Sequence, residues 1–353
     1  MWLSSEYPKK GYYAICSYES VARVERESFA PLVNFSSSRR EIRLDSSLRI
    51  RKLTEEEKVD IESEMDDADT SRYYIDREQI LSTTHSVSLR QLVPFEKDEA
   101  QNIRKKIFTL SIILRLFKEG NIGVPFVEFE VDRSRGRPKV RHITTSVLLL
   151  PSFTSTSLRK KYELDDNDSK RLKEFWTRFG PALNQDSLDR RTNIELAVGR
   201  FAMTNYRESV TDHIVDTIVG LEALFVPEND ELPYRLANRA CMVLGNSDRE
   251  REYVRQLVKT GYKVRSKIVH GGKIPGSLMI AERETALVEL SDRLERILAK
   301  SIVASCVLSE TFAKEELVEV LDSSLVLDKD RADIQSALRK DRKYLTIEGL
   351  PRL

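Results

Sequence analysis

The chain has 353 residues, more than a single domain usually contains, which predicts two folded units. Apolar residues make up 40% of it and charged residues 33%, a composition that excludes a largely disordered chain and is typical of a globular protein in water. Lys and Arg number 58 against 57 Asp and Glu, so the net charge neither predicts nor excludes a polyanionic partner. Contact with nucleic acid would need local basic patches.

Cysteine spacing and hydropathy further limit the class of protein to which the chain can belong. The three cysteines, Cys16, Cys241 and Cys306, are far apart and form no CxxC pair, which argues against a disulfide framework and against a zinc site. We expect no metal and no cofactor. Apolar runs stay well short of the ~20 residues that span a bilayer, and the opening MWLSSEYPKKGYY lacks the apolar core of a secretory signal. A cytoplasmic protein without a membrane partner is therefore expected.

The first part of the chain, residues 1–157, is predicted to be a mixed α/β domain. Alternating apolar residues in EIRLDSSLRIRKL predict two short strands around a turn. Thr54 and Glu57 have the spacing of a capping box, and the acidic run after them is interpreted as a solvated helix and loop rather than a metal site. Apolar residues at helical spacing predict a core-facing helix over residues 96–119 that ends at Gly120.

A β-hairpin is predicted next, over residues 127–150, because apolar residues alternate on both sides of a turn. Its tip is basic. Such a tip is more often a solvated turn than a nucleic-acid contact, and both alternatives stay open. The basic residues at and beside the tip are Arg133, Arg135, Arg137, Lys139 and Arg141.

The second part of the chain is predicted to be helical throughout. Residues 158–187 are interpreted as a connecting segment, residues 188–325 as an all-α domain, and residues 326–353 as a C-terminal helix and tail. His213 is expected to be structural and Cys241 to lie in the core. Helices are predicted over residues 188–206, 209–226, 234–245, 248–270 and 281–307.

The stretch YKVRSKIVHGGK, residues 262–273, is the candidate site. It places Arg265 and His270 at the end of an amphipathic segment that is followed by Gly271 and Gly272. Taken alone, the pattern predicts a basic last turn and a glycine cap. An active site is the alternative interpretation, because imidazole transfers protons near neutral pH and guanidinium holds phosphate oxygens.

Three stretches in order, DHIVDTIVGLEALFVP, LPYRLANRACMVLG and YKVRSKIVHGG, resemble the Apea-like branch of the HEPN superfamily over about residues 192–305. The first half of the chain is similar, more loosely, to the N-terminal region that is often found together with that branch. The resemblance implies an antiparallel helical bundle, frequently dimeric, in which Arg-x4-6-His marks the ribonuclease members. It also implies prokaryotic antiviral defence or stress as the setting, with an N-terminal domain that senses a protein or nucleotide trigger or restrains the nuclease.

Metal-independent RNA cleavage needs a base, an acid and a cation. His270 can fill either proton-transfer role, and Arg265 can hold the phosphate. One histidine cannot be base and acid in the same concerted step, so we expect a homodimer that brings two copies of His270 to one RNA strand. Positive charge for RNA is expected from Lys263, Lys267, Lys273 and Arg239.

Two supporting contacts are predicted from helical spacing. Tyr262, Ser266 and His270 fall in one row, which suggests that Ser266 orients the His270 ring. Glu222 lies in an otherwise core-facing row and therefore needs a cation, either Arg239 or Arg265, unless it is a half-exposed edge residue.

Two other function classes remain open at this stage. The chain could be a non-catalytic HEPN module that binds RNA or nucleotide, or that scaffolds an assembly. It could also be a regulator that binds DNA through the basic hairpin.

Overall fold

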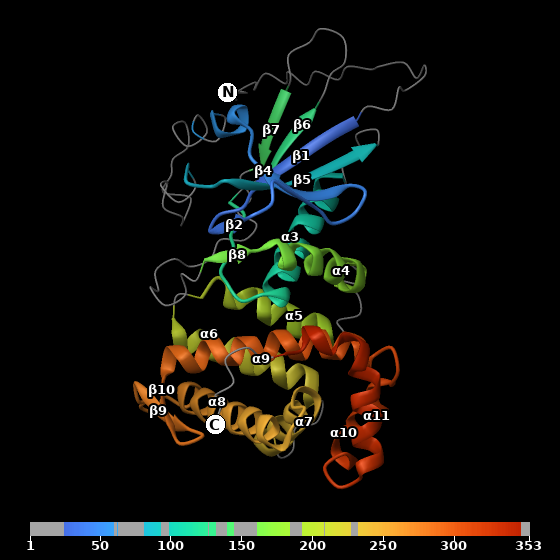
Figure 1. Ribbon diagram of the computed structural model, residues 1–353. Coiled ribbons are helices and arrows are strands. Elements are labelled where there is room, and N and C mark those ends of the chain that lie inside the picture. The colour runs from blue at the N-terminus through green and yellow to red at the C-terminus, as the bar shows by residue number, and fades with distance from the viewer. Residues whose placement is uncertain are drawn as a thin grey trace, which may run out of the picture.

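The computed structural model describes residues 25–59, 62, 81–92, 99–125, 127–131, 140–144, 161–183, 193–207, 209–226 and 232–346. A sheet lies at one end of the molecule, α3 and α4 lie in the middle, and helices α5 to α11 lie at the other end (Figure 1). The layout is therefore mixed α/β followed by helices, as predicted. No helix in these ranges is long and apolar enough to span a bilayer.

The sheet has six strands in the order β3-β4-β5-β1-β6-β7, and every neighbouring pair is antiparallel. The predicted strands around a turn are β3 and β4, and Asp45 closes the turn by accepting from the Ser47 and Leu48 amides at 2.7 and 2.8 Å. The strands are β1 Glu25–Pro31, β3 Glu41–Arg43, β4 Leu48–Lys52, β5 His85–Leu92, β6 Val127–Val131 and β7 Val140–Thr144.

Three further predictions for this part are confirmed. The capping box forms, with the Glu57 amide donating to Thr54 Oγ1 at 3.2 Å and the Thr54 amide donating to Glu57 Oε2 at 2.8 Å. The predicted core helix is α3, Glu99–Phe117. Strands β6 and β7 form the predicted hairpin. The basic tip of that hairpin lies outside the described residues, apart from the backbone of Arg141.

The segment that the sequence suggested as a connection carries regular structure. Strand β8, Tyr162–Leu164, pairs in parallel with β2, Phe35–Ser37, and α4, Asp166–Leu183, packs against α3. Tyr162 is completely buried, and its hydroxyl donates to the Leu114 carbonyl at 2.6 Å. The large apolar side chains that α4 buries are at helical spacing, so the sequence carried a local signal for this helix in addition to the long-range pairing of β8; they are Leu172, Phe175, Trp176 and Phe179.

The helical part confirms most of the predicted helix boundaries to within a few residues. The predicted C-terminal helix corresponds to α11. The elements are α5 Asn193–Thr204, α6 Val210–Phe225, α7 Leu232–Leu244, α8 Asp248–Val269, α9 Leu287–Leu308, α10 Lys314–Ser323, α11 Asp328–Leu338 and the 3-10 helix η3 Arg339–Tyr344.

The prediction that this part is entirely helical is wrong between α8 and α9. Strands β9, Ser277–Ile280, and β10, Arg283–Ala286, form an antiparallel hairpin there. Its turn residues Ala281 and Glu282 have φ of 48° and 62°, although such turns usually carry Gly or Asn. The Ala281 amide donates to Gln256 Oε1 on α8 at 2.8 Å, and Ile280 is buried. These contacts hold a turn that has no local sequence signal.

One hydrophobic core runs through both parts, from Ala30 in β1 to Leu345 after η3. Arg115 of α3 crosses between them: it donates to the Phe201 carbonyl of α5 at 3.1 Å and to Glu295 Oε1 of α9 at 2.5 Å. Glu295 also pairs with His213 of α6 at 3.2 Å, so His213 has the structural role that was expected. The two parts are thus joined by packing and by a buried ionic network.

Candidate functional site

Helix α8 ends in a Schellman motif that presents His270 to solvent. The Gly272 amide donates to the Lys267 carbonyl at 2.7 Å and the Gly271 amide to the Ile268 carbonyl at 3.1 Å, with Gly271 at a φ of 70°. His270 is the capping residue, with φ −94° and ψ 11°, and is exposed. The predicted glycine cap is confirmed, and it places His270 where the chain leaves the helix.

Arg265 is held by two side chains. Its terminal nitrogen lies 3.6 Å from Glu222 Oε2 on α6, and its guanidinium carbon lies 5.8 Å from the centre of the Tyr262 ring. The Arg265 side chain is 25% exposed and that of Glu222 17% exposed, so the pair is half-buried. Of the two cations proposed for Glu222, the structure selects Arg265.

The electrostatics of this pair are unusual. Burial raises the pKa of Glu222, and the charge of Arg265 opposes that rise. Glu222 Oε1 and Arg265 Nε are both buried, and neither has a hydrogen-bond partner among the described residues. The distance of 3.6 Å is an ion pair rather than a hydrogen bond. Glu222 therefore positions the guanidinium while leaving its hydrogen-bond donors unused.

Arg239 does not lie where an RNA contact would require it. It is fully buried and forms a two-pronged pair with Asp322, with both nitrogen–oxygen distances at 2.7 Å. It also donates to the Phe225 carbonyl at the end of α6, at 2.5 Å. The prediction that Arg239 binds RNA is wrong, because a side chain without solvent exposure ties α7 to α10 and α6 instead.

The contact predicted between Ser266 and the His270 ring is not formed. The Ser266 carbonyl accepts the His270 amide at 3.1 Å, but its hydroxyl makes no hydrogen bond to the ring. The capping dihedrals of His270 turn the chain out of the helical row, so spacing along the helix no longer predicts the ring position. Tyr262, the third member of that row, faces Arg265 instead.

A basic face extends along α8 toward His270. Residues 253–281 contain no Asp or Glu. Positions four residues apart share one side of a helix, so Arg255, Lys259 and Lys263 lie along one stripe that leads to the Ser266 and His270 end. The predicted RNA-binding lysines, Lys263, Lys267 and Lys273, are all exposed. The Lys and Arg residues in 253–281 are Arg255, Lys259, Lys263, Arg265, Lys267 and Lys273.

Other candidate chemistry is sparse in the described ranges. No three His, Cys, Asp or Glu side chains in them are grouped so that they could hold a metal ion. The two cysteines described are buried free thiols, and burial raises the pKa of Cys241 to about 11 and of Cys306 to about 12. Cys241 lies in the core as expected.

Sequence reasoning missed the network of Arg115, His213 and Glu295. Burial raises the pKa of Glu295, but Arg115 and His213 outweigh that effect and hold it well below its usual range. The available signal was a cation inside the apolar run SIILRLF, which demands a buried partner. Its partner lies 180 positions away and could not be read from spacing.

No family model matches the chain. No curated protein and no solved structure matches it either.

Proposed function

We propose that the chain is a metal-independent RNA endonuclease of the HEPN type, in which two copies of the chain complete one active site. The setting that fits this activity is antiviral defence or stress in the prokaryotic cytoplasm, with the N-terminal part responding to a protein or nucleotide trigger. The proposal extends the resemblance of the three helical stretches to the geometry at the end of α8.

One observation carries the proposal. Within one turn and a cap of α8, the structure has a guanidinium positioned by a carboxylate and an exposed imidazole at a glycine cap. Exposed lysines on the same element supply charge for phosphates. A helix that only ended on a glycine cap would not require a half-buried carboxylate from α6 to orient its arginine.

The reaction follows from these groups. The ribose 2′-oxygen attacks the adjacent phosphorus and gives its proton to one imidazole. The bond from phosphorus to the 5′-oxygen breaks, and that oxygen takes a proton from the second imidazole, so the products are a 2′,3′-cyclic phosphate and a 5′-hydroxyl. Arg265 offsets the charge that builds on the phosphate oxygens. Since each chain offers one His270, the partner copy supplies the second.

The alternative is a non-catalytic HEPN module that binds RNA or nucleotide. The ion pair between Arg265 and Glu222 favours this alternative. An arginine whose charge is neutralised by Glu222 can have the packing of α6 against α8 as its only role. The two candidates differ in whether a phosphodiester bond is cleaved.

The test is incubation of the full chain with mixed RNA in EDTA, followed by analysis of the ends. We expect cleavage that leaves 2′,3′-cyclic phosphate and that disappears in His270→Ala but persists in Lys329→Ala, a control at an exposed site on α11. Mixing wild-type protein with excess His270→Ala should lower activity in proportion to the remaining wild-type homodimer. Intact RNA in all samples, with the folded dimer and trigger present, would favour the non-catalytic module.

A further inference from the structure

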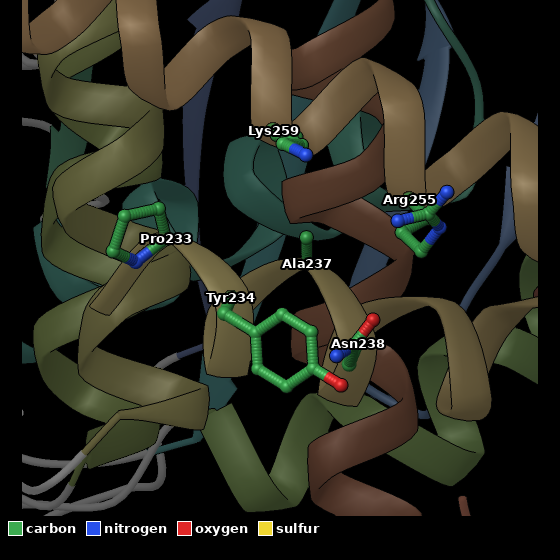
Figure 2. Close-up of a pocket in the computed structure, with 6 residues that line it drawn as sticks. All are labelled: Pro233, Tyr234, Ala237, Asn238, Arg255 and Lys259. Atoms are coloured by element: carbon green, nitrogen blue, oxygen red, sulfur yellow. The ribbon is translucent and has the colours of Figure 1, made fainter. Parts of the chain in front are cut away.

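A cavity of about 510 Å³ opens between α7 and α8 (Figure 2), and neither Arg265 nor His270 lines it. Two cationic side chains from α8 form one wall, and an aromatic ring and an amide from α7 form the other. Among the described residues, no carboxylate lines it. The lining residues are Pro233, Tyr234, Ala237, Asn238, Arg255 and Lys259.

Tyr234 gives this cavity an apolar surface that is open to solvent. Its side chain is 63% exposed, which is high for a large aromatic residue. Asn238 follows it by one helical turn, and Figure 2 shows the amide beside the phenol ring. A flat ring at the mouth of a cavity provides a face on which a planar ligand can stack.

Asn238 is the more telling residue. It is only 7% exposed, and it lines the cavity beside the Tyr234 ring. The Asn238 side-chain amide presents an acceptor oxygen and two N–H donors. A ligand that fits must offer both donors and acceptors on one edge, as a nucleobase does.

The cations suit a phosphate. Arg255 is fixed by Glu252, which accepts from its Nε and terminal nitrogen at 2.8 Å each. Lys259 is exposed, and after the hydrogen bond from Arg255 its charge also lowers the pKa of Glu252. The cavity thus combines a stacking face, an amide and a cation, which are three kinds of contact that bind a nucleotide.

We infer that this cavity binds one nucleotide of a single-stranded RNA, with the base stacked on Tyr234 and hydrogen-bonded by Asn238, and the phosphate held by Lys259. The inference rests on the proposed function in one respect, namely that the RNA strand runs from the cavity to His270. Lys259 and His270 are eleven residues apart, which is about 16 Å along a helix. The basic face of α8 covers that distance, so the cavity holds a nucleotide at a fixed separation from the cleaved bond.

RNA binding by the full chain carrying His270→Ala, which is expected not to cleave RNA, tests the cavity separately from catalysis. A labelled single-stranded oligoribonucleotide is titrated by fluorescence polarisation. We expect Tyr234→Ala to weaken binding about tenfold or more, with Tyr234→Phe close to the parent because the stacking face is kept. Lys259→Ala should weaken binding and reduce its salt dependence. Val326→Ala, a control at a residue 82% exposed after α10, should bind as the parent does.

Two outcomes would overturn the inference. Equal affinity of Tyr234→Ala and its parent, with unchanged circular dichroism, would show that nothing stacks on the ring. A nucleoside monophosphate that binds as tightly as the oligonucleotide, and loses affinity in Tyr234→Ala, would show that a free nucleotide is the occupant. Failure of the wild-type chain to cleave RNA would overturn the proposed nuclease but leave these binding results standing.

Discussion

Replacing Arg265 with alanine tests how the candidate site is built. Two unit charges 3.6 Å apart attract by about 5 kcal/mol at an effective dielectric constant of about 20. Loss of hydration offsets most of that attraction, because both groups are half-buried. Removal of the arginine leaves Glu222 without its cation, and we expect a loss of about 1 to 3 kcal/mol of stability. That loss corresponds to a fall of a few degrees in melting temperature.

The loss should depend on pH in a defined direction. Burial raises the pKa of Glu222 above its ordinary 4.5, so the folded state binds this proton more tightly than the unfolded state does. Its contribution to stability is fully present below pH 4.5 and is lost as pH rises through the folded pKa. Arg265 limits that loss by favouring the carboxylate. Arg265→Ala should therefore be more damaging at pH 7 than at pH 4.5.

The assay is thermal unfolding followed by circular dichroism for wild type, Arg265→Ala, Glu222→Gln and the double variant, at both pH values. Glu222→Gln removes the titrating group and keeps its shape. In that background Arg265→Ala should cost less, with the same effect at both pH values. Equal costs in the two backgrounds would refute the pairing, because coupled residues are not additive.

Other variants probe the rest of the fold. Arg115→Ala should lower stability by about 3 to 5 kcal/mol, because it strips Glu295 of its main cation. Because the pKa of Glu295 is depressed, its contribution to the stability of the wild type is present above pH 4.5 and is lost as pH falls. Glu295→Gln should therefore weaken the decrease of melting temperature at acid pH. Gly271→Ala should lower the free energy of unfolding by about 1 kcal/mol, because Gly271 has a positive φ. Gly199→Ala should instead raise the free energy of unfolding by as much as about 1 kcal/mol, because Gly199 lies inside α5 with open space around it. Arg239→Ala should lower the melting temperature without any specific loss of RNA binding, which filter binding of the folded variant checks.

The amino-acid sequence by itself determined the helices and the end of α8. Apolar residues at helical spacing mark α5 to α9, and Gly271 marks the cap, because these signals arise from neighbouring residues. The sequence also indicated a cation for Glu222, because a carboxylate in an apolar row needs a partner unless it lies at a half-exposed edge.

Only the tertiary structure decided which cation that is. Arg239 and Arg265 were equivalent candidates by sequence, and the packing of α7 against α10 commits Arg239 to Asp322. The hairpin between α8 and α9 was equally beyond local reasoning, because its turn is held by a hydrogen bond from the Ala281 amide to Gln256 Oε1 and contains no glycine. Packing of α7 against α8 likewise creates the cavity beside Asn238, because its two walls come from separate elements. Side chains from separate elements come into contact only when the chain is folded, and periodicity along one helix does not predict which side chains of other elements they contact.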